Sequence, residues 1–160
     1  MARTKHLTLA APKPRKAAQR AVFADFLPHL ITRLAYDLNL DLVEKLRVKG
    51  INLTRWRILA VLAMGEGITI IEIIDRAMLQ QSALSRALVN MEKEGYVRRV
   101  PSRKDARYVQ VFLTDAGRSL FKTLDVVVRR RQRRLLQGFS PRERAAAFAL
   151  IRRLTRNMVR

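Results

Sequence analysis

The stretch that decides the fold is residues 81–113, which read QSALSRALVNMEKEGYVRRVPSRKDARYVQVFL. In its first part apolar residues recur at three- and four-residue steps, and Gly95 is placed to end the resulting helix. After Gly95 the period changes to two, and residues 96–100 and 107–113 are rich in the β-branched and aromatic residues typical of strands. The stretch therefore predicts a helix over 81–94 followed by a β-hairpin with a polar, basic tip.

A short helix is predicted just before this stretch. Thr69 and Glu72 form the pattern T-x-x-E of a capping box, which marks the start of a helix. The connection at residues 78–80 is short enough to make a helix-turn-helix with the helix over 81–94. Helices followed by a two-stranded ribbon describe a winged helix-turn-helix, which we assign to residues 51–113.

Longer helices are predicted on both sides of the winged helix. Residues 22–47 carry apolar side chains at helical spacing, and Pro28 is tolerated if it lies near the first turn. Thr54 is placed to cap the next helix, and residues 114–137 and 140–158 are predicted to form two more. The expected fold class is mainly α with a small β-wing, a winged helix-turn-helix plus further helices.

The charge of the chain indicates a polyanionic partner. Its 160 residues include 33 Lys+Arg and 13 Asp+Glu, a net charge of +20, and nucleic acid is the leading candidate for the partner. There is no cysteine, which excludes a disulfide framework, a thiolate metal site and a thiol redox switch. No run approaches the ~18 consecutive apolar residues of a membrane span. We expect a cytoplasmic protein that does not bind membranes.

Residues 1–20 have a composition of their own. They include no acidic residue and six basic ones: Arg3, Lys5, Lys13, Arg15, Lys16 and Arg20. Residues 1–20 lack the continuous apolar stretch of a secretory signal peptide. We expect a flexible basic arm, which either grasps DNA or is a solvated tail.

One face of the helix over 81–94 is suited to reading DNA. The short hydroxyls of Ser82 and Ser85 permit close approach to bases, and Arg86 is long enough to reach a guanine edge or a phosphate. The residues predicted to contact DNA from this helix are Gln81, Ser82, Ser85, Arg86 and Val89. The structural alternative is an ordinary solvated helix face.

The predicted hairpin concentrates positive charge around one acid, Asp105. Its cations are Arg98, Arg99, Arg103, Lys104 and Arg107. Insertion into a minor groove is the natural use of such a wing, and Arg99, Arg103, Lys104 and Arg107 are the predicted contacts. Asp105 is expected to orient a neighbouring arginine, since a carboxylate facing phosphate would be repelled. The alternative is a solubilising hairpin.

The order of these elements resembles the MarR family of transcriptional regulators. The segments that carry the resemblance are LTRWRIL at 53–59, SALSRAL at 82–88, MEKEGYVRR at 91–99, DAR at 105–107 and LTDAG at 113–117. The resemblance spans about residues 22–158. It implies a homodimer built from residues 21–50 and 114–160, in which each winged helix reads one half of a pseudo-palindromic site in double-stranded DNA.

The resemblance also implies roles for single residues. It puts Ser82, Ser85 and Arg86 in the major groove and has the pair Asp105/Arg107 brace the wing. Many members carry arginine between that aspartate and arginine, where this chain has Ala106. Minor-groove contact must then come from Arg103, Lys104 or a re-aimed Arg107, or be weaker than usual.

The resemblance further implies a small-molecule effector, because family members often release DNA when an aromatic acid binds between the dimerisation and DNA lobes. The groups that could line such a cleft are Phe26, His29, Arg33, Tyr36, Trp56 and Arg57. Arg33 or Arg57 would pair with a carboxylate or phosphate while aromatic rings hold the apolar body of the ligand. A coenzyme A thioester would suit the basic surface. The alternative is that Phe26, Tyr36 and Trp56 are core residues.

Catalytic chemistry is not expected. The histidines are His6 and His29, and no metalloprotease, phosphate-loop or nucleophile-elbow motif occurs. We therefore expect no enzyme, no metal and no cofactor, but a ligand-responsive repressor released from its operator by an effector. The runner-up is a sequence-tolerant structural nucleic-acid-binding protein without an effector. The arginine run at 129–134 is expected to be solvated or ion-paired and not to contact DNA.

Overall fold

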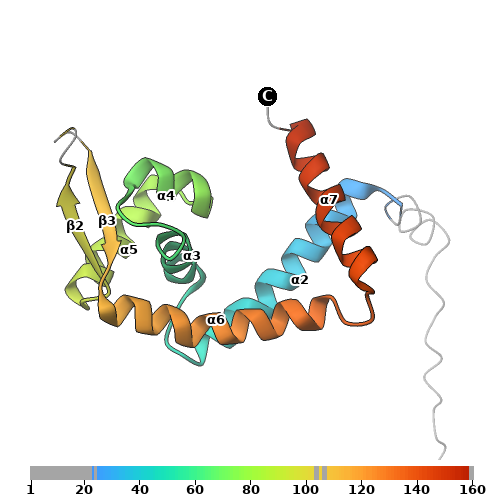
Figure 1. Cartoon of the computed structure of the whole chain (residues 1–160), viewed down its shortest axis with the longest axis horizontal. Helices are drawn as coiled ribbons and strands as arrows, with labels where there is room; N and C mark the ends of the chain where they lie inside the picture. The colour runs from blue at the N-terminus through green and yellow to red at the C-terminus, as the bar shows by residue number, and fades with distance from the viewer. Residues whose placement is uncertain (1–22, 24, 103–104, 106–107, 159–160) are drawn as a thin grey trace, which may run out of the picture. The chain divides into compact units, whose positions relative to one another are not determined.

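The computed structural model describes residues 23, 25–102, 105 and 108–158 of the chain (Figure 1). Its elements are α2 (Leu27–Arg47), α3 (Leu53–Leu62), β1 (Ile68–Thr69), α4 (Ile70–Ala77), α5 (Gln81–Lys93), β2 (Val97–Pro101), β3 (Val109–Leu113), α6 (Asp115–Leu135) and α7 (Pro141–Met158). The chain forms two compact units, divided between Glu44 and Lys45 within α2. The predicted fold class, mainly α with a small β-wing, is confirmed. Residues 1–20, the predicted basic arm, lie outside the described residues.

Helix α2 accounts for most of the first unit's described residues. Pro28 is its second residue, where a missing backbone N–H costs no helical hydrogen bond. Apolar side chains at three- and four-residue spacing form a stripe along the helix. The stripe residues Leu27, Leu30, Ile31 and Leu34 are each 41–49% exposed, so none of them is buried by the residues that the structure describes.

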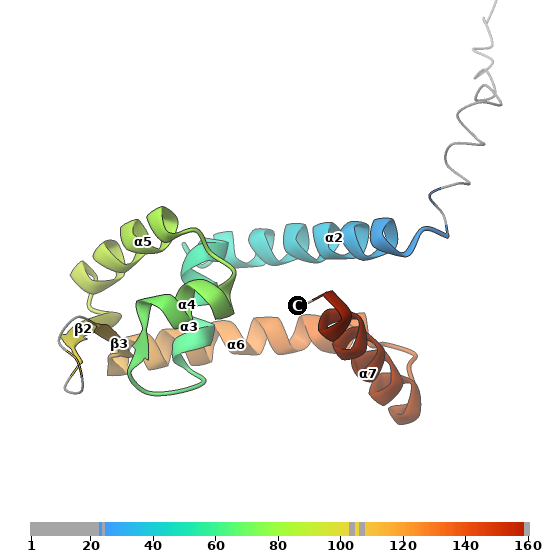
Figure 2. The same ribbon diagram turned by 90° about the horizontal axis from the view of Figure 1, so that it is seen from above.

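The core of the second unit lies among α3, α4 and α5, which gather at the N-terminal end of α6 (Figure 2). Helices α4 and α5 each turn one apolar face inward, whereas α3 is buried on most of its sides. The fully buried side chains include Ile58, Leu59 and Leu62 of α3, Ile73 of α4, and Leu84, Leu88 and Met91 of α5. Burying a side chain of this size stabilises the fold by about 1.5–3 kcal/mol, so this cluster holds the three helices in one arrangement.

The start of α3 differs from the prediction that Thr54 would cap it. Asn52 is the N-cap, and its Oδ1 accepts a hydrogen bond from the backbone N–H of Arg55 at 2.9 Å. Asparagine and threonine are both good N-caps, and the sequence offers both within three residues. Thr54 consequently lies inside the first turn.

The helix-turn-helix follows the prediction closely. Thr69 caps α4 in a complete capping box, with the Thr69 backbone N–H donating to Glu72 at 2.9 Å and the Glu72 N–H donating to Thr69 Oγ1 at 3.3 Å. Helix α4 ends at Ala77, and Met78 takes the left-handed conformation with φ of 51°. The chain then turns sharply enough for α5 to begin at Gln81.

The hairpin belongs to a three-stranded antiparallel sheet in the order β1-β3-β2. In the register of β2 and β3, Val97 pairs with Leu113 and Arg99 pairs with Val111. Strand β1 was not predicted because its two residues are too few to show a period. It pairs Ile68 with Val111 and thereby ties the hairpin to the start of α4.

Helix α6 leaves the sheet directly. Its N-cap Thr114 accepts a hydrogen bond from the Gly117 N–H at 3.1 Å. The ring of Phe121 stacks on Trp56 of α3, with the centroids 5.7 Å apart and the planes 6° from parallel. This stack and the buried Leu124 fix α6 against the winged helix. Helix α7 begins with a capping box formed by Ser140 and Glu143, and none of its described side chains is buried.

Candidate nucleic-acid interface

The outer face of α5 is fully available to a partner. The inner residues Leu84, Leu88 and Met91 are buried, which fixes the rotation of the helix about its axis. The predicted contact residues Gln81, Ser82, Ser85, Arg86 and Val89 are all exposed. The helix thus brings together on one face every residue that the sequence predicted for it.

The middle of this face is hollowed. Ser85, Arg86, Val89 and Asn90 line a shallow hollow of about 410 Å³. The side chain of Arg86 has no ion-pair partner among the residues that the structure describes. Asn90 was missed by the sequence analysis, although its place four residues after Arg86 puts the two on one side of the helix. Its amide offers a donor and an acceptor toward a base edge.

The N-terminus of α5 is also open. Gln80 is the N-cap and makes no side-chain capping hydrogen bond, and the first turn contains no acidic residue. The first N–H groups of a helix have no partner within it and carry a partial positive charge. This end of α5 is therefore suited to an anionic group such as a DNA phosphate.

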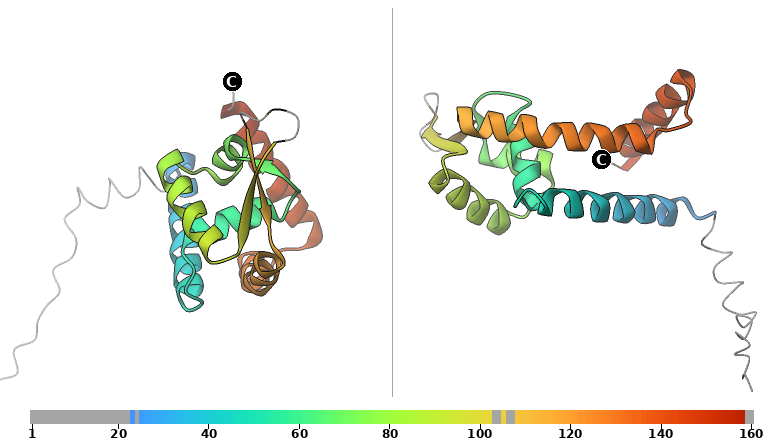
Figure 3. Two further views of the ribbon diagram at one scale, coloured as in Figure 1. Left: turned by 90° about the vertical axis from the view of Figure 1, so that its left-hand side faces the viewer. Right: turned by 90° about the horizontal axis from the view of Figure 1, so that it is seen from below.

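The strand residue Arg99 is held by Glu92 of α5. Its backbone N–H donates to Glu92 Oε1 at 3.0 Å and its Nε donates to Glu92 Oε2 at 2.8 Å. These hydrogen bonds lower the pKa of the Glu92 carboxyl, with the side-chain bonds as the largest cause. The guanidinium of Arg99, a predicted DNA contact, is thus engaged in joining β2 to α5, and the two elements lie side by side (Figure 3).

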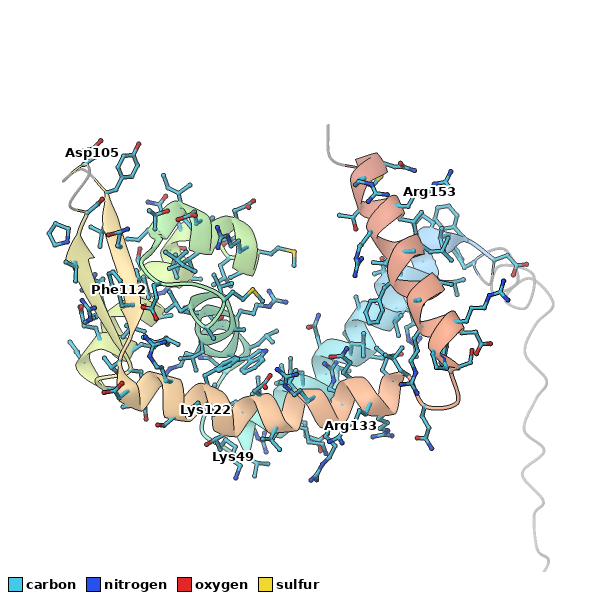
Figure 4. The ribbon with its side chains drawn as sticks, in the orientation of Figure 1. Lys49, Asp105, Phe112, Lys122, Arg133 and Arg153 are labelled. Atoms are coloured by element: carbon cyan, nitrogen blue, oxygen red, sulfur yellow. The ribbon has the colours of Figure 1, made fainter. Side chains whose placement is uncertain are left out.

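The rest of the hairpin is described in part. Arg98 lies over the ring of its cross-strand partner Phe112, 4.2 Å from the centroid, so its charge is partly occupied. Near the tip, the Ser102 N–H donates to the Tyr108 carbonyl at 2.8 Å and the Tyr108 N–H donates to the Asp105 carbonyl at 3.0 Å. Asp105 is half-buried at the end of the hairpin (Figure 4). The other predicted wing residues, Arg103, Lys104, Ala106 and Arg107, lie outside the described residues.

The predicted effector residues fall in both units. In the first unit, Phe26 and Tyr36 are 52% and 59% exposed, so neither is buried by the described residues of the single chain. His29 lies beside Phe23, with the ring centroids 5.4 Å apart, and Arg33 pairs with Asp37 at 3.2 Å.

In the second unit, Trp56 is buried against Phe121, as the core alternative for it proposed. Arg57 is half-buried and has no ion-pair partner among the described side chains. A common cleft for the six residues stays a prediction.

The described part of the chain contains no group of three or more His, Cys, Asp or Glu side chains that could hold a metal ion. Within the same residues, none of the helices has the length and apolarity needed to cross a membrane.

Comparison with protein families gives a match to the MarR family over residues 49–107. This range begins just before α3 and includes the helix-turn-helix and β2. The match thus covers α5 and β2 of the candidate interface and ends before β3.

The chain is also similar to individual transcriptional regulators, in sequence and in fold. The HTH-type transcriptional regulator TtmR of Methylorubrum extorquens is 39% identical over 71 residues, which are 44% of this chain and 36% of that relative. The chain thus spans about a third of the relative's length. A MarR-family transcriptional regulator from Silicibacter pomeroyi is 31% identical, with a TM-score of 0.79 over 86% of this chain and 92% of that chain. The Streptomyces coelicolor regulator PcaV, solved in complex with its natural ligand, has a TM-score of 0.72 at 23% identity, over 86% of this chain and 96% of that one.

Proposed function

The chain belongs to the MarR family of transcriptional regulators, and on that premise we propose that it is a homodimeric repressor that reads a pseudo-palindromic operator in double-stranded DNA. The observation that carries the proposal is the outer face of α5, where exposed polar side chains surround Arg86, which has no ion-pair partner among the described residues. A helix of this kind reads base edges in the major groove from its N-terminal half.

We assign the contacts as follows. Ser82 and Ser85 let the helix approach the bases, Arg86 forks onto a guanine edge or a phosphate, and Asn90 joins them. The open N-terminus of α5 receives a backbone phosphate. Glu92 and Arg99 hold the hairpin at a fixed angle to α5, so that the wing reaches the neighbouring groove.

The dimer is proposed to form through residues 21–50 and 114–160. The exposed apolar stripe of α2 and the apolar side chains of α7 support this assignment, because monomeric proteins rarely leave such surfaces open. A two-fold dimer presents two α5 helices to successive half-sites about one helical turn of DNA apart.

Substitution of Arg86 tests the proposal. A binding site is first selected from random duplex DNA with the wild-type protein, and affinities for that site are then measured at one salt concentration. Loss of one bidentate base contact costs about 1–3 kcal/mol, so Arg86→Ala should bind the selected site about 5- to 150-fold more weakly. Arg130→Ala is the matched control, since Arg130 is an exposed arginine on α6 without an ion-pair partner among the described residues. Equal affinities of the two variants would contradict the assignment.

The runner-up function, sequence-tolerant nucleic-acid binding, is favoured by the net charge of +20 alone. Competition with random DNA separates the two functions. A sequence-specific regulator remains bound to its selected site in a large excess of random DNA. A structural binder is instead distributed over all the DNA present.

The effector is proposed to be a small aromatic carboxylate or its coenzyme A thioester. The PcaV structure, which contains that protein's natural ligand, supports the idea that the fold accommodates an effector. Binding would favour a dimer in which the α5 spacing no longer fits the half-sites. A panel of such acids and thioesters should lower affinity for the selected site, and Arg57→Ala or Arg33→Ala should abolish the response without weakening DNA binding. A panel that leaves DNA binding unchanged would contradict this part of the proposal.

A further inference from the structure

The end of α6 and the start of α7 enclose a second hollow, of about 440 Å³, whose chemistry differs from that of the α5 face. Its lining consists of Arg129, Gln132, Arg133, Leu136 and Arg144. Arg129, Gln132 and Arg133 follow the spacing i, i+3 and i+4, which puts them on one face of α6, and Leu136 is the C-cap residue just after the helix. Arg144 reaches the same hollow from the first turn of α7. Three guanidinium groups are thereby brought to one place.

The fold fixes two of these arginines through Nε alone. Arg144 Nε donates to the carbonyl oxygen of Phe139 at 2.9 Å, and Arg129 Nε pairs with Asp125. The terminal amino groups of Arg144 have no partner among the described residues, and Arg133 has no ion pair there. A guanidinium held at Nε with its terminal amino groups unused is prepared to bind an anion.

The local charges do not balance. Three positive charges line the hollow, and Asp125 supplies one negative charge beside it. Glu143 is directed away to its capping box, where the Ser140 backbone N–H and hydroxyl each donate to it at 2.7 Å. These hydrogen bonds lower the pKa of Glu143, with the side-chain bond as the largest cause. An anion carrying two or more charges would relieve the repulsion among the arginines.

We propose that this hollow is a binding site for a small molecule that carries a phosphate or pyrophosphate group. Arginine matches tetrahedral oxyanions because its planar fork donates two parallel hydrogen bonds. Leu136 supplies an apolar wall for the part of the ligand next to the phosphate, and Gln132 supplies an amide.

The site is separate from the DNA-reading face. Arg133 comes 18 residues after Asp115, the first residue of α6, and a helix rises 1.5 Å per residue. The hollow therefore lies roughly 27 Å along α6 from the hairpin. The inference does not depend on the DNA-reading role proposed for α5, because the hollow lies at the other end of α6, within the proposed dimerisation region 114–160.

Calorimetry on the full chain tests the proposal, with inorganic pyrophosphate as the probe in 0.3 M KCl to suppress diffuse attraction. One saturable site per chain is expected. The double variant Arg133→Gln/Arg144→Gln should bind pyrophosphate at least 10-fold more weakly. The matched control is Arg152→Gln/Arg153→Gln, which removes the same charge from α7 outside the hollow. The affinity of this control variant for pyrophosphate should stay within twofold of that of the wild type. Figure 4 shows that Arg153 lies on α7, whereas Arg133 lies on α6.

A second arm separates a soluble phosphate compound from the DNA backbone. Both double variants are titrated with a short random duplex, and circular dichroism confirms that both are folded. Equal duplex affinities together with selective loss of pyrophosphate binding support the site. The proposal is overturned if pyrophosphate shows no saturation, if the control variant loses as much affinity as the hollow variant, or if the hollow variant selectively loses duplex binding.

Discussion

Arg99 of β2 and Glu92 of α5 are joined through both main chain and side chain. The Arg99 backbone N–H binds one carboxylate oxygen of Glu92, and Nε and Nη2 bind the other. Because the main chain takes part, the pair fixes the strand as well as the arginine. The helix that carries the proposed base contacts and the hairpin that forms the wing are therefore linked by one acidic residue.

Glu92→Gln should weaken this link in a pH-dependent way. The folded-state pKa of Glu92 is lowered, so its contribution to stability is fully present above the unfolded value of about 4.3 and is lost as pH falls through the lower folded value. Both side chains are about one-third exposed, so the expected loss at pH 7 is only ~0.5–1 kcal/mol. Urea unfolding should show wild type and variant converging as the pH falls below 4.3.

Glu44→Gln is the matched control for that measurement. Glu44 is exposed on α2 and pairs with none of the described residues, so its substitution changes the net charge equally without breaking a pair. If the control shows the same pH-dependent loss as Glu92→Gln, the effect belongs to net charge and the pair contributes nothing.

Gly117→Ala should destabilise the fold although glycine lies inside a helix. A Cβ on Gly117 would stand 2.0 Å from the carbonyl oxygen of Tyr96, which also accepts a hydrogen bond from the Thr114 N–H. Alanine gains about 1 kcal/mol in helix propensity, but the clash is with backbone and cannot be relieved by a rotamer change. We expect a net loss of about 1–3 kcal/mol or more in urea unfolding.

Gly65→Ala provides the comparison for this prediction. At that position the nearest atom, in the Ile68 side chain, is 3.7 Å away and the backbone is not in the left-handed region. The free energy of unfolding of the Gly65→Ala variant should stay within about 0.5 kcal/mol of that of the wild type. Equal effects of the two substitutions would show that α6 can move away from Tyr96.

The helix-turn-helix could be predicted from the sequence because its signals are local. The Thr69–Glu72 capping box, the short connection after Ala77 and the apolar period of α5 each act within a few residues. The two-residue strand β1 could not be predicted in this way. It exists only because β3 offers a partner 43 positions further along, from Ile68 to Val111.

The candidate site likewise has one part that the sequence predicted and one part that it did not. Exposure of Ser82, Ser85 and Arg86 follows from helical period, so the sequence predicted it correctly. The engagement of Arg99 did not follow, because a charge count treats every arginine of the hairpin alike. Between Glu92 and Arg99 the chain leaves α5, turns and enters β2, so the two side chains meet only in the folded protein.

Deleting residues 1–20 should reduce the salt dependence of DNA binding. The segment carries six Lys and Arg and no acidic residue. Each phosphate contact adds about 0.9 to the slope of log K against log salt, so loss of the arm should lower the slope by up to about 5. A full-length variant with those six residues changed to glutamine separates charge from length. Slopes identical to the wild type in both variants would show that these cations do not contact phosphate.

Ile151→Glu should dissociate the proposed homodimer. Ala147, Ile151, Leu154 and Met158 follow the helical period along one face of α7, yet no described side chain of this helix is buried within the chain. A partner that covers the stripe would have to bury the new carboxylate unpaired, which is strongly unfavourable. Sedimentation should show at least a 10-fold higher dimer dissociation constant. Ala149→Glu introduces the same charge about 200° away on the helix and should leave the dimer intact. Equal dissociation of both variants, or a stable Ile151→Glu dimer, would exclude this face of α7 from the interface.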